Sequence, residues 1–248
     1  MKYIILSFDD GRKDNYDYAY KLMLKYGIKA SMHIPTSFID ENEQNHLSLE
    51  KVQEMSKAGF DFSSHGHKHI NEKHDLAQSL TCLKDWKLID SDNIVFSSPE
   101  SEIYKKNLPL YKKMLDSNDV KHVRTGTQIR REGFFYTLFY LCQKIFQSRR
   151  LFYLLNKSNL HKINEPNYLI KSVAIKYDNS VRQLEYFINK MQDGNVAVFL
   201  FHSIIPEKEM KNKDVWSFSA EKFEVFLQLI AKKKIIEILT IKEYIKRN

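Results

Sequence analysis

The 248-residue chain carries 39 Lys and Arg against 31 Asp and Glu, a formal net charge of +8, and 43% of its residues are hydrophobic. With only 7 Gly and 5 Pro, this composition excludes a disordered or collagen-like protein. Two cysteines, Cys82 and Cys142, are too few for a disulfide framework or a cysteine-rich metal site. The positive charge favours anionic partners, but the basic residues are dispersed and no nucleic-acid reader motif occurs, so we do not expect nucleic-acid binding.

Short apolar runs alternate with segments of helical period along the whole chain, which favours an α/β fold with a mostly parallel sheet. Three of the helical segments, Tyr16 to Tyr26, Leu49 to Ala58 and Val181 to Met191, end at or near a glycine. Seven or eight repeats of one β/α unit favour a closed or nearly closed barrel, and we expect residues 1–248 to form one domain. The expected strands are residues 3–8, 28–34, 60–63, 94–97, 121–124, 169–175, 196–201 and 235–239.

The segment from Gly133 to Leu155 breaks this rhythm, because it is too apolar for a solvent loop and too long for a barrel connection. We expect an inserted helical hairpin, bounded by residues 131–162. Its aromatic and leucine face is typical of a helix in a membrane interface, and a lid packed on the barrel or a dimer contact explains it equally well. The basic residues that accompany it are Arg130, Arg131, Lys144, Arg149, Arg150 and Lys157.

The amino terminus shows no recognisable export signal. The apolar run after Met1-Lys2 stops at Asp9 and is shorter than the roughly 7 to 15 residues of a signal-peptide core. No apolar stretch reaches the roughly 18 residues of a transmembrane helix. We therefore expect a cytoplasmic protein, with peripheral contact at the inner membrane face through residues 133–155 as a further hypothesis. The sequence carries no signal for an oligomeric state.

Two adjacent carboxylates, Asp9 and Asp10, follow the first expected strand. An ionised carboxylate costs several kcal/mol to bury unless a partner or a cation compensates it. We therefore expect a cation at this strand end. Taken alone, the Asp-Asp-Gly sequence is explained equally well by a polar turn that caps a helix starting near Asp14.

Histidines follow two further strands. His65 and His69 come after strand 60–63, and their spacing of four places both imidazoles on one side of a helical turn, which favours a shared metal ion. His67 points away at this spacing and is expected in the pocket or behind the ligands. His202 ends the apolar strand 196–201. In a parallel barrel, the carboxyl ends of these strands meet on the face where barrel enzymes build their sites.

The run Ser7 to Gly11, the His65-x-x-x-His69 pair and Leu200-Phe201-His202 resemble, in order and spacing, the three motifs of the polysaccharide deacetylases. This family is also called the NodB homology domain or carbohydrate esterase family four. The resemblance implies a distorted (β/α) barrel of about seven parallel strands, with Asp9 as general base and His202 as general acid. It also implies a divalent ion held by Asp10, His65 and His69; we expect Zn²⁺, and Co²⁺, Ni²⁺ or Fe²⁺ suit the same ligands.

The implied activity is the removal of N-acetyl groups from an amino sugar of a polysaccharide or a glycan precursor, which includes lipid-linked sugars. Two alternatives fit the same residues. One is a glycan-binding barrel without catalysis that keeps the metal site. The other is an O-acetyl esterase or an amidase for a non-sugar amide, because an activated water attacks either carbonyl.

The chain departs from the family pattern at one strand end, where Ser97-Ser98-Pro99-Glu100 replaces Arg-x-Pro-Tyr. The arginine that would orient the base is therefore missing there. Arg124, at the next strand end, is a candidate replacement, and a solvated arginine is the alternative. A backbone N–H near Pro99 is a candidate donor to the reacting oxygen. Trp216 follows His202 rather than preceding it, and we expect it to line the pocket and stack on a sugar.

Overall fold

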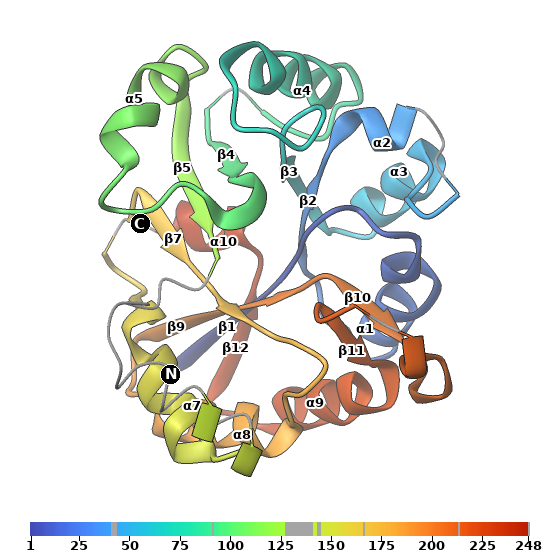
Figure 1. The fold of residues 1–248 in the computed structure, drawn as a ribbon, viewed down its shortest axis with the longest axis vertical. Coiled ribbons are helices and arrows are strands. Elements are labelled where there is room, and N and C mark those ends of the chain that lie inside the picture. The colour runs from blue at the N-terminus through green and yellow to red at the C-terminus, as the bar shows by residue number, and fades with distance from the viewer. Residues whose placement is uncertain are drawn as a thin grey trace.

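The computed structural model describes residues 1–40, 44–90, 92–126, 141–142, 145–165, 167–212 and 214–247. Its centre is a ring of parallel strands with helices around it (Figure 1). The strands are β1 (Lys2–Phe8), β2 (Ser31–Ile34), β3 (Asp61–Ser64), β4 (Ile94–Ser97), β5 (Val120–Thr125), β6 (His161–Lys162), β7 (Leu169–Lys171), β8 (Val173–Ala174), β9 (Asn195–Phe201), β10 (Ser203–Ile205), β11 (Ser217–Ser219) and β12 (Ile236–Leu239).

The helices follow the strands on the outside of the ring (Figure 1). Polar caps define several of their starts; Ser180, for example, accepts from the backbone N–H of Gln183, whose side chain accepts from the N–H of Ser180 in return. The α-helices are α1 (Lys21–Lys25), α2 (Thr36–Asp40), α3 (Leu49–Lys57), α4 (Lys73–Asp85), α5 (Leu108–Asp116), α7 (Arg149–Asn156), α8 (Val181–Lys190), α9 (Ala220–Lys232) and α10 (Ile241–Lys246). A π-helix, Asn15–Tyr20, leads into α1, and short 3₁₀ turns cover Pro99–Ser101, Lys157–Asn159 and Glu207–Asn212.

The strand order β9-β1-β2-β3-β4-β5-β7 runs round the ring. The expected strand 169–175 divides at Ser172, so that β7 pairs with β5 while β8 pairs with β9. One short segment thereby brings the two ends of the sheet together. The predicted barrel is confirmed, and its distortion has a second source: β12 pairs with the first half of β1, and β2 pairs with the second half.

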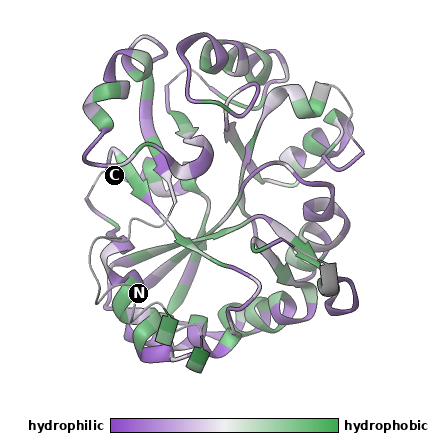
Figure 2. Cartoon of the chain, in the orientation of Figure 1, coloured by the Kyte–Doolittle hydropathy of each residue, from purple (hydrophilic) through white to green (hydrophobic). Residues whose placement is uncertain are grey.

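Phenylalanine rings pack together at the carboxyl ends of β1 and β9. Phe8 and Phe201 stand opposite each other in register and stack with their ring centroids 5.5 Å apart. Phe223 of α9 packs edge-on against both rings. Full burial of each ring stabilises the fold by about 1.5–3 kcal/mol. The packing also fixes the next residue of each strand, so Asp9 and His202 leave the barrel side by side. Figure 2 shows hydrophobic residues along these central strands.

The expected insert lies partly outside the described residues, which omit 127–140, 143 and 144, so the hairpin stays a prediction. Within it, α7 is helical and packs on α8: Phe152 is buried with its ring centroid 6.0 Å from that of Phe187, and Tyr153 lies 5.6 Å from the same ring. Part of the aromatic face therefore belongs to the core. Among the described residues, no helix has both the length and the apolar character needed to cross a bilayer.

Candidate metal centre and active site

Asp9 and Asp10 leave β1 in different directions because the backbone turns between them. Asp10 and Gly11 take positive φ angles of 70° and 59°. A Cβ on Gly11 would lie 2.9 Å from Cγ2 of Ile34, so both the angle and the space require glycine. As a result, Asp9 is 3% exposed inside the barrel mouth, whereas Asp10 is partly exposed above it.

A loop, rather than the predicted helical turn, holds His65 and His69. Its centre is Asp75 of α4, whose two carboxylate oxygens accept from the backbone N–H groups of His67 and Lys68, each at 2.7 Å. Gly66, with φ of 81°, passes so close that a Cβ would lie 2.6 Å from the Asp75 carboxylate. The carboxylate thus wraps the chain into a tight loop. The expectation of a helical turn was wrong, although the two imidazoles do meet.

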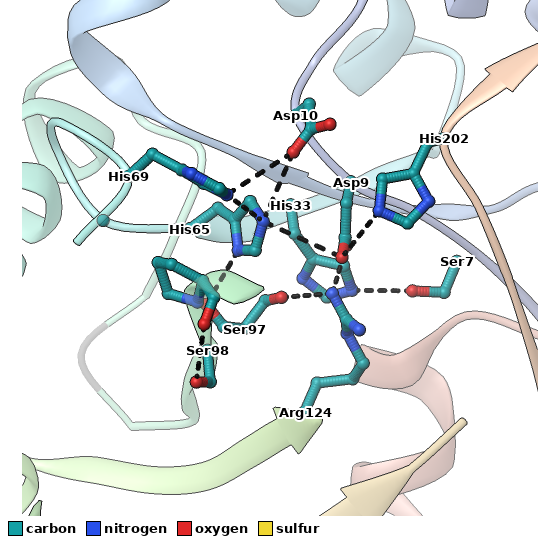
Figure 3. A network of polar contacts seen from close by, with 12 residues as sticks. Ser7, Asp9, Asp10, His33, His65, His69, Ser97, Ser98, Arg124 and His202 are labelled. Carbon is teal, nitrogen blue, oxygen red and sulfur yellow. Dashed lines mark hydrogen bonds and ion pairs between the residues drawn. The ribbon is translucent and has the colours of Figure 1, made fainter. Parts of the chain in front are cut away.

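The side chains of Asp10, His65 and His69 converge on one point (Figure 3). Oδ1 of Asp10 lies 3.5 Å from Nε2 of His65 and 3.6 Å from Nε2 of His69, and the two nitrogens are 3.1 Å apart. Ligands at about 2.0–2.1 Å from a tetrahedral ion are roughly 3.3 Å from one another. The three donor atoms therefore form a triangle that matches one face of such a tetrahedron, which leaves one vertex for a further ligand.

The tautomer of His65 suits this arrangement. Its Nδ1 donates to the backbone carbonyl of Ser97 at 2.8 Å, which leaves the lone pair of Nε2 directed at the triangle. His67, in contrast, turns away and pairs through Nδ1 with the Thr36 hydroxyl at 2.9 Å. The residues fit a divalent ion by number and donor type. His67 does not belong to the triangle, in line with the direction expected from its spacing.

Asp9 lies beneath the triangle and faces a buried arginine. Nη2 of Arg124 donates both to Oδ1 of Asp9 and to the hydroxyl of Ser97, and Arg124 is 0% exposed (Figure 3). Burial opposes ionisation of Asp9, but Arg124, His65 and His202 hold the pKa of its carboxyl below the usual range. The arginine expected at position 97 is a serine in this chain. Arg124 thus pairs with the Asp9 carboxylate in its place. Two further Arg124 donors, Nε and Nη1, are buried without a hydrogen-bond partner among the described residues.

His202 approaches Asp9 from β9. Its Nε2 lies 3.9 Å from Oδ2 of Asp9, beyond hydrogen-bond distance, and its backbone carbonyl accepts from the Asn15 side chain at 2.5 Å. Its Nδ1 is buried without a hydrogen-bond partner in the described part of the chain. Burial lowers the pKa of His202, against the opposing effect of Asp9 and Asp10.

Trp216 and Pro99 both lie near these groups. The Trp216 ring packs on His202 with centroids 4.7 Å apart, and the ammonium group of Lys176 lies over the same ring, 4.6 Å from its centroid. Trp216 therefore supports His202, and its expected stacking on a sugar stays a prediction. The Pro99 carbonyl accepts from the Asn71 side chain at 3.1 Å, on the loop that follows Ser97.

Two residues of the site were missed in the sequence. His33 is buried on β2, where Nε2 pairs with the Ser7 hydroxyl at 3.0 Å and Nδ1 with the Ser63 hydroxyl. Burial and the charge of Arg124 hold its pKa well below the usual value, so His33 is neutral. Arg12 binds Asp10. Two signals were available in the sequence. His33 stands among the apolar residues of an expected barrel strand, and Arg12 is a cation directly after Asp-Asp-Gly.

Residues 1–114 match the model of a protein family described as polysaccharide deacetylase. The predicted resemblance to the polysaccharide deacetylases is confirmed. The provisionally named polysaccharide deacetylase YxkH of Bacillus subtilis is 36% identical to this chain over 69 residues, which are 28% of this chain. The aligned part is only 24% of the length of YxkH.

Two solved structures resemble nearly the whole chain. The Xyl-CE4 domain of a multidomain xylanase from the hindgut metagenome of Trinervitermes trinervoides has a TM-score of 0.56 at 14% identity, over 99% of this chain and 90% of that one. A family 4 acetyl xylan esterase from Clostridium thermocellum, in complex with a cobalt ion, has a TM-score of 0.53 at 14% identity, over 98% and 90%. At these identities the likeness shows the shared barrel fold.

Proposed function

We propose that the protein is a metal-dependent hydrolase that removes N-acetyl groups from an amino sugar of a glycan or glycan precursor. The observation that carries the proposal is the triangle of Asp10, His65 and His69 directly above the buried carboxylate of Asp9. The deacetylase family match over residues 1–114 supports it.

Asp10, His65 and His69 would hold the ion, and their donor set suits Zn²⁺ first and Co²⁺, Ni²⁺ or Fe²⁺ as well. A divalent ion bound there lowers the pKa of a coordinated water toward about 7 and polarises the acetyl carbonyl. A backbone N–H beside Pro99, on the Ser97 loop, is the proposed second donor to the carbonyl oxygen.

Asp9 would act as general base. Its Oδ2 lies 3.8 Å from Nε2 of His65, so a water at the triangle is within its reach. Arg124 holds the other oxygen, Oδ1, and keeps the carboxylate ionised and fixed in direction. Because Arg124 binds Oδ1 and leaves Oδ2 to face the triangle, Arg124 would be a positioning residue for the base.

His202 would be the general acid. Its Nε2 lies 3.9 Å from the same carboxylate oxygen of Asp9, so the base and the proposed acid adjoin the same side of the triangle. Because burial lowers its pKa, protonated His202 is a stronger acid than a free imidazolium and gives its proton readily to the departing amine. The proton that Asp9 takes from water then replaces the proton that His202 has given to the amine. Trp216, packed on the imidazole, holds it in place.

The experiment measures acetate release by purified protein that is stripped with a chelator and reloaded with Zn²⁺ or Co²⁺. The panel contains N-acetylglucosamine oligomers, peptidoglycan fragments, nucleotide sugars and lipid-linked sugars, with acetylated xylan as the ester substrate. We expect release of acetate from an N-acetylated member only in the reloaded protein. Release from acetylated xylan alone favours the esterase, and tight glycan binding without acetate favours the non-catalytic barrel.

Asp9→Asn tests the base in the same assay. Asparagine keeps the shape of the side chain but accepts no proton, so we expect activity to fall by about 10²–10⁴-fold while metal is still bound. Asp17→Asn, a surface carboxylate paired with Lys51 at 3.6 Å, is the matched control and should keep full activity. Full activity in Asp9→Asn would contradict the assignment of the base.

We also propose that part of segment 133–155 contacts an anionic membrane surface. Ile145 and Phe146 are 71% and 74% exposed, and the exposed Arg149 and Arg150 follow them at the start of α7. Apolar side chains beside arginines favour the interface of an anionic bilayer. Such contact would bring the site to lipid-linked sugars.

A further inference from the structure

Arg12 saturates one oxygen of Asp10. Its Nε and Nη2 both donate to Oδ2 of Asp10, at 3.1 Å and 3.0 Å. The other oxygen, Oδ1, is the one that faces His65 and His69. A carboxylate held in this way cannot rotate, so it presents a single oxygen to the triangle.

The remaining amino group of Arg12 reaches a different part of the chain. Nη1 donates to Oδ2 of Asp214 at 2.8 Å and to the Ser203 hydroxyl at 3.2 Å. Asp214 in turn accepts from the backbone N–H of Trp216 through Oδ1 at 2.7 Å. Trp216 is the ring that packs on His202. Arg12 therefore lies between a metal-ligand carboxylate and the segment that supports the imidazole.

We propose that Arg12 is a positioning residue that locks Asp10 for single-oxygen ligation and, through Asp214, ties the position of Trp216 to the same carboxylate. The proposal rests on the metal site proposed above. The side chain of Arg12 is 25% exposed, so its contacts are partly shielded from water, and hydrogen bonds that involve charged groups contribute more than neutral ones. Loss of such an outer partner typically weakens metal binding by about 10–100-fold.

The test is a Co²⁺ titration of the full chain, followed by visible absorption, with Trp216 fluorescence recorded in a Trp86→Phe background. We expect Arg12→Gln to bind Co²⁺ about 10–100-fold more weakly and to change the visible spectrum, since Asp10 becomes free to rotate. Arg12→Lys should be weakened less, because an ammonium still pairs with Asp10. Asp214→Ala should keep the Co²⁺ spectrum but alter the Trp216 emission. Lys13→Gln, an exposed neighbouring cation, should match the unaltered protein in both readouts.

Unchanged Co²⁺ affinity and spectrum in Arg12→Gln would overturn the proposal, as would Trp216 emission that is the same in Asp214→Ala. If Arg12→Gln does not fold by circular dichroism, Arg12→Lys decides: Co²⁺ binding weaker than in the unaltered protein supports the lock, and unchanged Co²⁺ affinity refutes it. The readout is metal binding rather than acetate release. An unaltered protein that binds Co²⁺ but releases no acetate would therefore refute the proposed function and leave this inference standing.

Discussion

Replacing Arg124 by methionine should both destabilise the protein and disturb its base. Arg124 is fully buried, and Asp9, its partner, is 3% exposed. Removing one member of a buried ion pair costs about 3–5 kcal/mol, because the other charge stays buried without compensation. Methionine also removes two arginine donors, Nε and Nη1, that are buried without a hydrogen-bond partner among the described residues, which offsets part of the loss. We therefore expect a loss of about 3 kcal/mol in unfolding free energy, or roughly 6–12 °C in Tm.

The pH dependence identifies the cause. Arg124 helps to depress the pKa of Asp9 in the folded state, so the stability it contributes is present above the unfolded pKa of 3.8 and is lost as pH falls below it. The difference between Arg124→Met and the unaltered protein should therefore be largest near pH 7 and shrink toward pH 3–4, as urea unfolding at both pH values will show. In Arg124→Met the acid limb of kcat/KM should also move to higher pH, because the effect of burial, which raises the pKa of Asp9, then meets less opposition.

Asp9→Asn in the Arg124→Met background should restore part of the lost stability, since no buried charge remains. Lys121→Met, an exposed cation on the same strand, is the matched control. Equal stability of Arg124→Met and the unaltered protein at pH 7, or no rescue by Asp9→Asn, would refute the reasoning.

Two further predictions concern other regions. Burial raises the pKa of Asp61 to about 6, so the folded protein loses stability as pH rises from about 4 to 6. Asparagine at this position still accepts from the N–H of Lys242 but carries no charge. Asp61→Asn should therefore gain about 1–3 kcal/mol in unfolding free energy at pH 7, measured with urea, and nothing near pH 4. A gain that persists at pH 4 would contradict this account. Replacing Ile145 and Phe146 by serine should reduce co-sedimentation with vesicles that contain anionic lipid, whereas Val225→Ser, an exposed apolar residue of α9, should not; equal binding of all three proteins would exclude the membrane contact.

The barrel was predictable because its strands are short apolar runs ended by polar residues. The division of strand 169–175 at Ser172 was not, because it depends on two different neighbours, β5 and β9, which are distant in sequence. The same holds for β10 and β11, which are three residues each and pair only with one another among the described strands. The local pattern of apolar and polar residues does not indicate which strands pair.

The candidate site divides in the same way. Asp9, Asp10, His65, His69 and His202 follow strand ends directly, so parallel topology alone brings them together. The shape of the His65–His69 loop depends on Asp75, which lies on the next helix, and the helical spacing rule failed there. Arg12 binds Ser203 and Asp214 as well as the nearby Asp10, and His33 pairs with groups of β1 and β3; one sequence gives no distance between such segments.

The position of β1 has a consequence for how the chain folds during synthesis. β1 is made first, yet it pairs with β9 along one edge and with β12 along part of the other, as in Tyr3 with Val196 and Lys2 with Ile236. Residues 2–5 of β1 therefore have no strand partner until β9 and β12 are synthesised, whereas Ser7 and Phe8 can pair early with β2. We expect the barrel to close slowly and late in folding. Until then, the unpaired edges of β1 are exposed and can pair with other chains. A fragment that ends at residue 114 would keep that exposure permanently.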